Sequence, residues 1–181
     1  MTSLTAFTVL VLLVGLERVA ELVVSKRNAA WSMAHGGRET GRGHYPVMVV
    51  LHTGFLVAML VEAWVVRPDV PAALAWSMLA LVVAAQALRW WCIATLGRRW
   101  NTRVIVVPGL PPVTGGPYRF LPHPNYVAVV VEGVALPMVH LAWITAVVFT
   151  VANAVLLSVR IRVEDAALAT LPAPGAGRVD A

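Results

Sequence analysis

One short segment, residues 115–126, concentrates residue types that can bind a ligand. It reads Gly-Gly-Pro-Tyr-Arg-Phe-Leu-Pro-His-Pro-Asn-Tyr. Its glycines allow the backbone to approach a ligand closely, and its prolines restrict the chain. Because His123 and Pro124 precede a predicted helix, we expect the free amides of Asn125 and Tyr126 to bind an anionic group. The segment predicts one wall of a pocket, and the alternative is a rigid turn in which His123 caps a helix.

A second polar group lies further along the chain. Arg160 and Glu164 are four residues apart, so they share one face of a predicted helix, and Arg162 and Asp165 lie beside them. We expect this helix end to lie at the same membrane surface as segment 115–126, so that the two groups can meet. The alternative interpretation is an interfacial ion pair with basic anchors.

Several charged residues fall inside or at the ends of apolar runs, where a charge at mid-depth costs about 2.5 to 3.5 kcal/mol. Arg18 and Glu21 are three residues apart and can pair on one helix. Glu132 lies about two turns into its predicted helix, so its carboxylate should face protein or a cavity, with Arg89 as a candidate partner. The full set is Glu17, Arg18, Glu21, Glu62, Arg89 and Glu132.

The composition predicts that membrane helices position these groups. The chain has 181 residues, of which 59% are hydrophobic and 13% are charged, and its mean hydropathy is +0.77. Such a chain does not fit a water-soluble surface. The apolar stretches are long enough for five passes, and Pro137 divides the last stretch into a hairpin with a short first arm. We predict an all-α polytopic membrane protein with helices in residues 4–24, 46–66, 71–94 and 126–159.

The basic residues predict an orientation. Four Lys or Arg residues lie in the loop 25–44, one lies in 67–70, and four lie in 97–124. By the positive-inside rule, the N-terminus is outside, and both large loops and the C-terminus are cytoplasmic. The net charge of +5 is spread over these loops rather than gathered in one patch, which does not favour a nucleic-acid partner.

We divide the chain into N-terminal helices (1–95), a core with a cytoplasmic cofactor-binding loop and the C-terminal hairpin (96–169), and a disordered tail (170–181). We expect no metal site, because the sole cysteine is Cys92 and the histidines lack the spacing of metal ligands.

The motif residues resemble a known family, the isoprenylcysteine carboxyl methyltransferases, from about residue 88 to residue 168. The resemblance is carried by Gly116-Pro117-Tyr118-Arg119, by His123-Pro124-Asn125-Tyr126 and by Arg160 with Glu164-Asp165. Pro122 stands where the family usually has Arg, and the long final helix of the protein methyltransferases is missing. The first departure affects one expected cofactor contact, for which Arg119 is the candidate replacement. The second favours a small lipid acceptor over a prenylated protein.

Other segments look more like the bacterial branch of that family that is linked to type III polyketide synthases. These are residues 101–109, Glu17-Arg18 and residues 25–28. Members of that branch O-methylate long-chain alkylpyrones. The resemblance therefore implies an alkylpyrone or related phenolic lipid as acceptor, a functional link to such a synthase, and a place in a bacterial plasma membrane.

The resemblance implies S-adenosylmethionine as the methyl donor, and no glycine-rich nucleotide fingerprint follows a strand, so the membrane helices must hold it. Arg160 and Glu164 are the expected catalytic residues: Arg160 orients the anionic acceptor, and Glu164 fixes Arg160 or binds the donor. The expected acceptor-binding residues are Glu132, Arg89 and Arg160. The expected donor-binding residues are Gly116, Pro117, Tyr118, Arg119, His123, Pro124, Asn125, Tyr126 and Glu164.

Three other functions stay open at this point. One is a carboxyl methyltransferase of prenylcysteine-like acids. Another is an NADPH-dependent membrane reductase, because the integral membrane sterol reductases carry a related His-Pro-x-Tyr element. The third is a non-catalytic lipid-binding protein whose polar residues only stabilise the helices.

Overall fold

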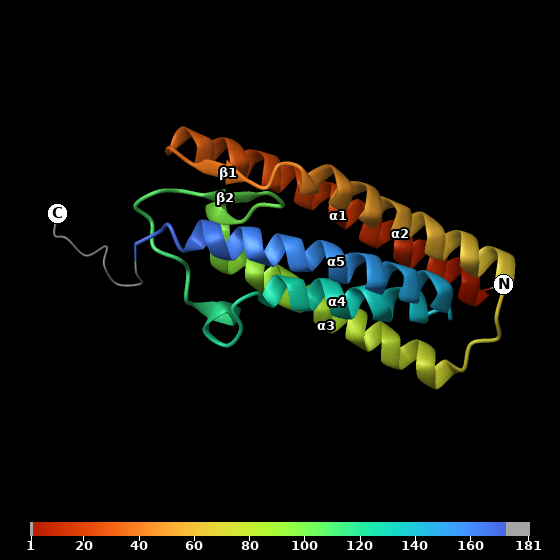
Figure 1. The fold of residues 1–181 in the computed structure, drawn as a ribbon. Coiled ribbons are helices and arrows are strands. Elements are labelled where there is room, and N and C mark those ends of the chain that lie inside the picture. The colour runs from red at the N-terminus through yellow and green to blue at the C-terminus, as the bar shows by residue number, and fades with distance from the viewer. Residues whose placement is uncertain (1, 173–181) are drawn as a thin grey trace.

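Five helices running along one common axis form the computed structural model, which describes residues 2–172 (Figure 1). The elements are α1 (Thr2–Ala34), α2 (His44–Val66), α3 (Ala72–Leu96), α4 (Pro124–Met138) and α5 (Trp143–Leu168), with two short 3-10 turns, η1 (Gly97–Arg99) and η2 (Gly116–Arg119). The predicted all-α fold class is confirmed. Of the predicted disordered tail, only residues 170–172 lie within the described part of the chain.

Three segments are long and apolar enough to cross a membrane: α2, α3 together with η1, and α5. Their outward-facing side chains include the exposed Val50, Val83 and Val151, which suit contact with lipid. The chain is therefore an integral membrane protein of five helices, and the first arm of the C-terminal hairpin is short, as the sequence predicted. At 15 residues α4 is shorter than a full pass, and α1 carries Glu17, Arg18 and Glu21 near its middle.

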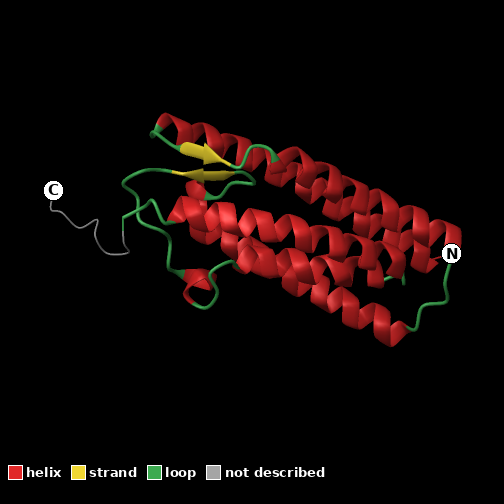
Figure 2. Ribbon diagram, viewed as in Figure 1, coloured by secondary structure: helices red, strands yellow, loops and turns green. Residues whose placement is uncertain are grey.

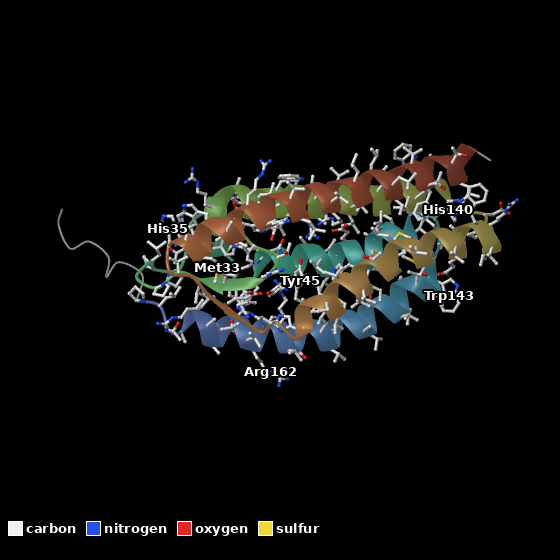
Figure 3. All side chains as sticks on the ribbon, turned by 90° about the horizontal axis from the view of Figure 1, so that it is seen from above. Met33, His35, Tyr45, His140, Trp143 and Arg162 are labelled. Atoms are coloured by element: carbon white, nitrogen blue, oxygen red, sulfur yellow. The ribbon has the colours of Figure 1, made fainter. Side chains whose placement is uncertain are left out.

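The helices alternate in direction, so both large loops and the C-terminal end of α5 lie together at one end of the bundle (Figure 1). We call this the loop end, and we call the opposite end, which carries the connections α2–α3 and α4–α5, the turn end. Figure 3 shows Met33 and His35 at the loop end and His140 and Trp143 at the turn end. The shared position of the two loops is the arrangement that the predicted topology requires.

Two three-residue strands, which the sequence did not predict, join the large loops. Strand β1 (Arg38–Thr40) pairs antiparallel with β2 (Val104–Val106), and Arg38 lies opposite Val106 (Figure 2). The valines of β2 pack with Ala167 of α5, in a small cluster that also includes Leu171. The pairing therefore ties the loop 97–123 to the first loop and to the end of α5.

The predicted hairpin between α4 and α5 is present, and the two helices approach closely. A Cβ atom on Gly133 would lie 2.6 Å from Phe149 Cε1, so only glycine fits there without a shift. Phe149 in turn stacks on Phe55 of α2, with ring centroids 4.0 Å apart. These contacts place the hairpin against α2 and form part of the apolar core near the turn end.

Glu62 of α2 caps the first turn of α5. Its carboxylate accepts hydrogen bonds from the backbone amides of Ile144 at 2.9 Å and Thr145 at 2.7 Å, and from the Thr145 hydroxyl at 2.7 Å. The first amides of a helix have no partner within the helix, and a carboxylate also complements the helix dipole. Glu62 therefore fixes the start of α5 against the end of α2.

We expect Glu62→Ala to lower the free energy of unfolding by about 1 to 2 kcal/mol, because the amides of α5 lose their acceptor. Thermal unfolding in detergent micelles measures the effect. The matched control is Asp69→Ala, which removes an exposed carboxylate from the neighbouring α2–α3 connection. Equal shifts for the two variants would contradict the capping role.

Candidate active site

The hydroxyl of Tyr126 joins the two polar groups that the sequence singled out. Arg160 Nε donates a hydrogen bond to this oxygen at 2.9 Å, and the hydroxyl donates to the carboxylate of Glu164. The expected meeting of segment 115–126 with the end of α5 is therefore observed. Within residues 2–172 Glu164 does not pair directly with Arg160 and instead reaches it through Tyr126.

Arg160 is buried, with 6% of its surface exposed, and its two terminal nitrogens contact neutral groups. One terminal nitrogen donates to the Thr102 carbonyl at 2.6 Å, and the other lies 2.9 Å from the Met48 sulfur. No carboxylate of the described residues lies within ion-pair distance of this guanidinium. A buried positive charge without an anionic partner is costly, so this position favours an anionic ligand.

His123 is held by the acidic residues at the end of α5. Its Nε2 lies 2.9 Å from Asp165 Oδ1, and its Nδ1 lies 3.7 Å from Glu164 Oε1. The carboxylate of Glu164, with that of Asp165 beside it, raises the pKa of His123 above its usual value. The expectation of a free Tyr126 amide was wrong, because that amide donates to the His123 carbonyl at 3.1 Å.

A cavity of about 340 Å³, which we call the loop cavity, opens beside this group at the loop end. Its walls come from the loop 97–123, from the start of α4 and from the end of α5. Of the predicted donor-binding residues, those that line it are Tyr118, His123, Asn125, Tyr126 and Glu164. Arg160 lines it as well.

Four predicted donor-binding residues do not line the loop cavity: Gly116, Pro117, Arg119 and Pro124. Gly116 has φ +54°, and a Cβ there would overlap Thr95 Oγ1, so its missing side chain lets η2 pack on α3 rather than on a ligand. Pro117 is buried, whereas Arg119 is exposed and lies over the Phe120 ring at 5.9 Å. Gly116 of the motif therefore serves the packing of η2 on α3.

A second cavity of about 170 Å³, the bundle cavity, lies between the helices. It is lined by apolar side chains of α1, α2, α4 and α5 together with charged residues, among them Arg89 and Glu132. The candidate pair of these two residues is present, with Arg89 donating to Glu132 at 2.6 Å. Both residues therefore face a cavity inside the bundle, deeper than Arg160.

The two cavities share one wall. The residues that line both are Trp100, Asn101, Asn125, Tyr126 and Arg160. In this wall, Asn101 Oδ1 and Asn125 Oδ1 are buried and have no hydrogen-bond partner among the described residues. Buried amide oxygens without partners are uncommon in proteins, and here they can accept hydrogen bonds from the amino or hydroxyl groups of a ligand.

Sequence reasoning assigned no ligand-binding role to Trp100, Asn101 or β2, although they form much of the loop cavity. The available signal was the β-branched run Val104–Val107, which favours a strand after a membrane helix. Asn101 carried no such signal, because a single asparagine in a polar loop is most often hydrated.

Comparisons with known proteins identify the family of this chain. The family model described as "Isoprenylcysteine carboxyl methyltransferase (ICMT) family" matches residues 78–170, just over half of the chain. A protein of Bacillus subtilis (strain 168), described as "Uncharacterized protein YpbQ", is 36% identical over 162 residues, which cover 90% of this chain and 96% of that protein. No solved structure matches. The chain belongs to the isoprenylcysteine carboxyl methyltransferase family, whose members are methyltransferases that generally use S-adenosylmethionine.

Proposed function

We propose that this protein transfers a methyl group from S-adenosylmethionine to an oxygen of a small lipophilic acceptor, a long-chain alkylpyrone or a related phenolic lipid. The observation that carries the proposal is the meeting of two cavities at Arg160, a buried guanidinium without a carboxylate partner among residues 2–172. In this proposal the loop cavity holds the donor and the bundle cavity holds the acceptor.

The residues of the loop cavity fit the donor. Its volume of about 340 Å³ lies within the range of small-molecule sites. The free amide oxygens of Asn101 and Asn125 and the carboxylate of Glu164 can accept hydrogen bonds from amino and ribose hydroxyl groups. The aromatic faces of Trp100 and Tyr118 suit an adenine ring or a sulfonium cation. When bound, the donor supplies an activated methyl group.

Apolar residues such as Val14, Leu56 and Leu157 line the bundle cavity and suit the apolar part of a lipophilic acceptor. A 4-hydroxypyrone is largely anionic near neutral pH, so its oxygen needs orientation more than it needs a general base. Arg160 would hold that oxygen, and Tyr126 would hold Arg160. Alignment of the two reactants can lower the activation free energy by about 7 to 11 kcal/mol relative to reactants free in water.

The proposal includes an orientation and a partner. The loop end carries both basic loops, which supports placing it in the cytoplasm of a bacterial plasma membrane. The resemblance of residues 101–109 to the branch that serves type III polyketide synthases supports a functional link to such a synthase. A membrane-embedded acceptor cavity would take the alkyl product directly from the lipid phase.

The acceptor class is tested by methyl transfer from labelled S-adenosylmethionine to matched lipids that share one alkyl chain. We expect alkylpyrones and alkylresorcinols to become labelled. Labelling of prenylcysteine alone would favour the second candidate, a carboxyl methyltransferase, because a guanidinium also binds carboxylates well. Labelling of no lipid, with a thermal shift by NADPH rather than by S-adenosylmethionine, would contradict both proposals.

We expect Arg160→Ala to lower kcat/KM for methyl transfer by on the order of 100-fold, because the acceptor oxygen loses its cationic partner. Binding of S-adenosylhomocysteine, measured by calorimetry, should weaken by less than kcat/KM falls, although Arg160 also lines the loop cavity and holds Tyr126. Arg162→Ala is the matched control, since Arg162 lies on the outer side of α5 (Figure 3). Near-normal turnover of Arg160→Ala would contradict its role.

The contact of His123 with Glu164 and Asp165 predicts a pH-dependent stability. The raised pKa of His123 means that the protonated imidazole stabilises the fold fully below its unfolded pKa of about 6.5, and that this contribution is lost as the pH rises through the folded value. We expect His123→Gln to lower the melting temperature more at about pH 6 than at about pH 9. The control is His35→Gln, and a larger loss at the higher pH would contradict the assignment.

A further inference from the structure

The inner end of the bundle cavity carries more polar groups than a site for an alkyl chain needs. We infer that these groups form a second recognition site for the acceptor, which binds a second hydroxyl group on its ring, as in a resorcinol-type lipid. The inference rests on the proposed function for its claim that the ligand of this cavity is the methyl acceptor. We call the site the cavity floor and define it by Glu21, Arg89, Glu132 and Asn153, all of which line the cavity.

The cavity floor is buried and charged. Glu21, Arg89 and Glu132 are each buried, and Arg89 Nε lies 3.8 Å from Glu21 Oε1. Arg18 completes the group: it donates to Glu21 at 2.8 Å and lies 3.7 Å from Glu132. Ion pairs at this depth join α1, α3 and α4, and this structural role accounts for the charges themselves.

The ion pairs leave bonding capacity unused. Glu21 Oε1 and Arg89 Nε face each other at 3.8 Å, which is too far for a hydrogen bond, and Asn153 Oδ1 lies apart from this ion pair on α5. All three atoms are buried and have no hydrogen-bond partner within residues 2–172. Each buried polar group left unsatisfied costs about 1 to 3 kcal/mol. A ligand hydroxyl can accept a hydrogen bond from Arg89 Nε and donate its one proton to Asn153 Oδ1 or Glu21 Oε1, so it satisfies two of the three groups.

Asn153 is the residue that favours a ligand site over a purely structural network of ion pairs. It lies on α5, whereas the ion pairs join α1, α3 and α4, and only 2% of its surface is exposed. No described residue accepts or donates a hydrogen bond at its side-chain oxygen. An asparagine that only stabilised the bundle would be expected to have a partner there.

The distance between the two ends of the cavity sets the size of the ligand head. Glu132 follows Tyr126 by six residues on α4, or about 9 Å, and Asn153 precedes Arg160 by seven residues on α5, or about 10 Å. These backbone rises are of the same order as a six-membered ring with a hydrogen-bonded oxygen at each end.

The experiment compares a 5-alkylresorcinol with the 3-alkylphenol of the same chain length, which lacks the second hydroxyl. We expect the wild-type protein to favour the resorcinol in kcat/KM by about 10-fold or more, after correction for its two equivalent hydroxyls. Asn153→Leu should bring this ratio close to one. The matched control is Thr150→Leu, an equivalent change on the exposed side of α5, which should keep the wild-type ratio.

The selectivity ratio separates recognition from folding, because a variant that is merely destabilised loses activity with both acceptors. Equal kcat/KM for the two acceptors in the wild type, or an unchanged ratio in Asn153→Leu, would overturn the inference and leave the proposed methyl transfer intact. Thermal shifts by the two lipids in donor-free protein give a second readout. The wild type could bind the resorcinol preferentially, and Asn153→Leu could lose this preference, while neither protein transfers a methyl group. That outcome would refute the proposed function and keep the cavity floor as a binding site.

Discussion

Burying the Arg160 guanidinium is the constraint on which the arrangement of the loop end depends. A positive charge removed from water needs partners for its donors, and those present are the Tyr126 hydroxyl, the Thr102 carbonyl and the Met48 sulfur. These come from α4, from the loop before β2 and from α2, so a single side chain on α5 holds three elements in register. All three partners are neutral, which leaves the charge available to an anionic ligand.

The rest of the bundle keeps this geometry fixed. At the turn end, Glu62 anchors the start of α5 to α2, and the close contact of Gly133 with Phe149 fixes α4 against α5. Midway along the bundle, the pair of Arg89 with Glu132 joins α3 to α4. Because helices are stiff, anchors at these two levels determine where Tyr126 and Arg160 lie at the loop end. Ionic and polar contacts inside the bilayer thus define the site as much as apolar packing does.

Much of this arrangement could be predicted from the sequence. Apolar runs locate the helices, since lipid exposure leaves a strong compositional signal, and the cost of a charge in lipid explains why Arg18 pairs with Glu21 and Arg89 with Glu132. The position of both large loops at one end of the bundle followed from helices that alternate in direction. The boundary between the N-terminal helices (1–95) and the core (96–169) stays a prediction.

Other features depend on contacts between distant residues. Strands β1 and β2 have three residues each, too few for a periodic pattern, and they pair across two loops. The glycine at position 116 has the same sequence signal whether its backbone meets a ligand or Thr95. Asn101 and Asn153 are single polar residues, whose lack of partners is visible only when the surrounding side chains are in place.

We propose that donor and acceptor occupy different cavities and meet at Arg160. A structure of the protein with S-adenosylhomocysteine and an alkylpyrone measures this directly. We expect the sulfur in the loop cavity, the alkyl chain in the bundle cavity, and the pyrone oxygen about 2.7 to 3.2 Å from an Arg160 nitrogen. Both ligands in one cavity, or a pyrone oxygen out of contact with Arg160, would contradict the account.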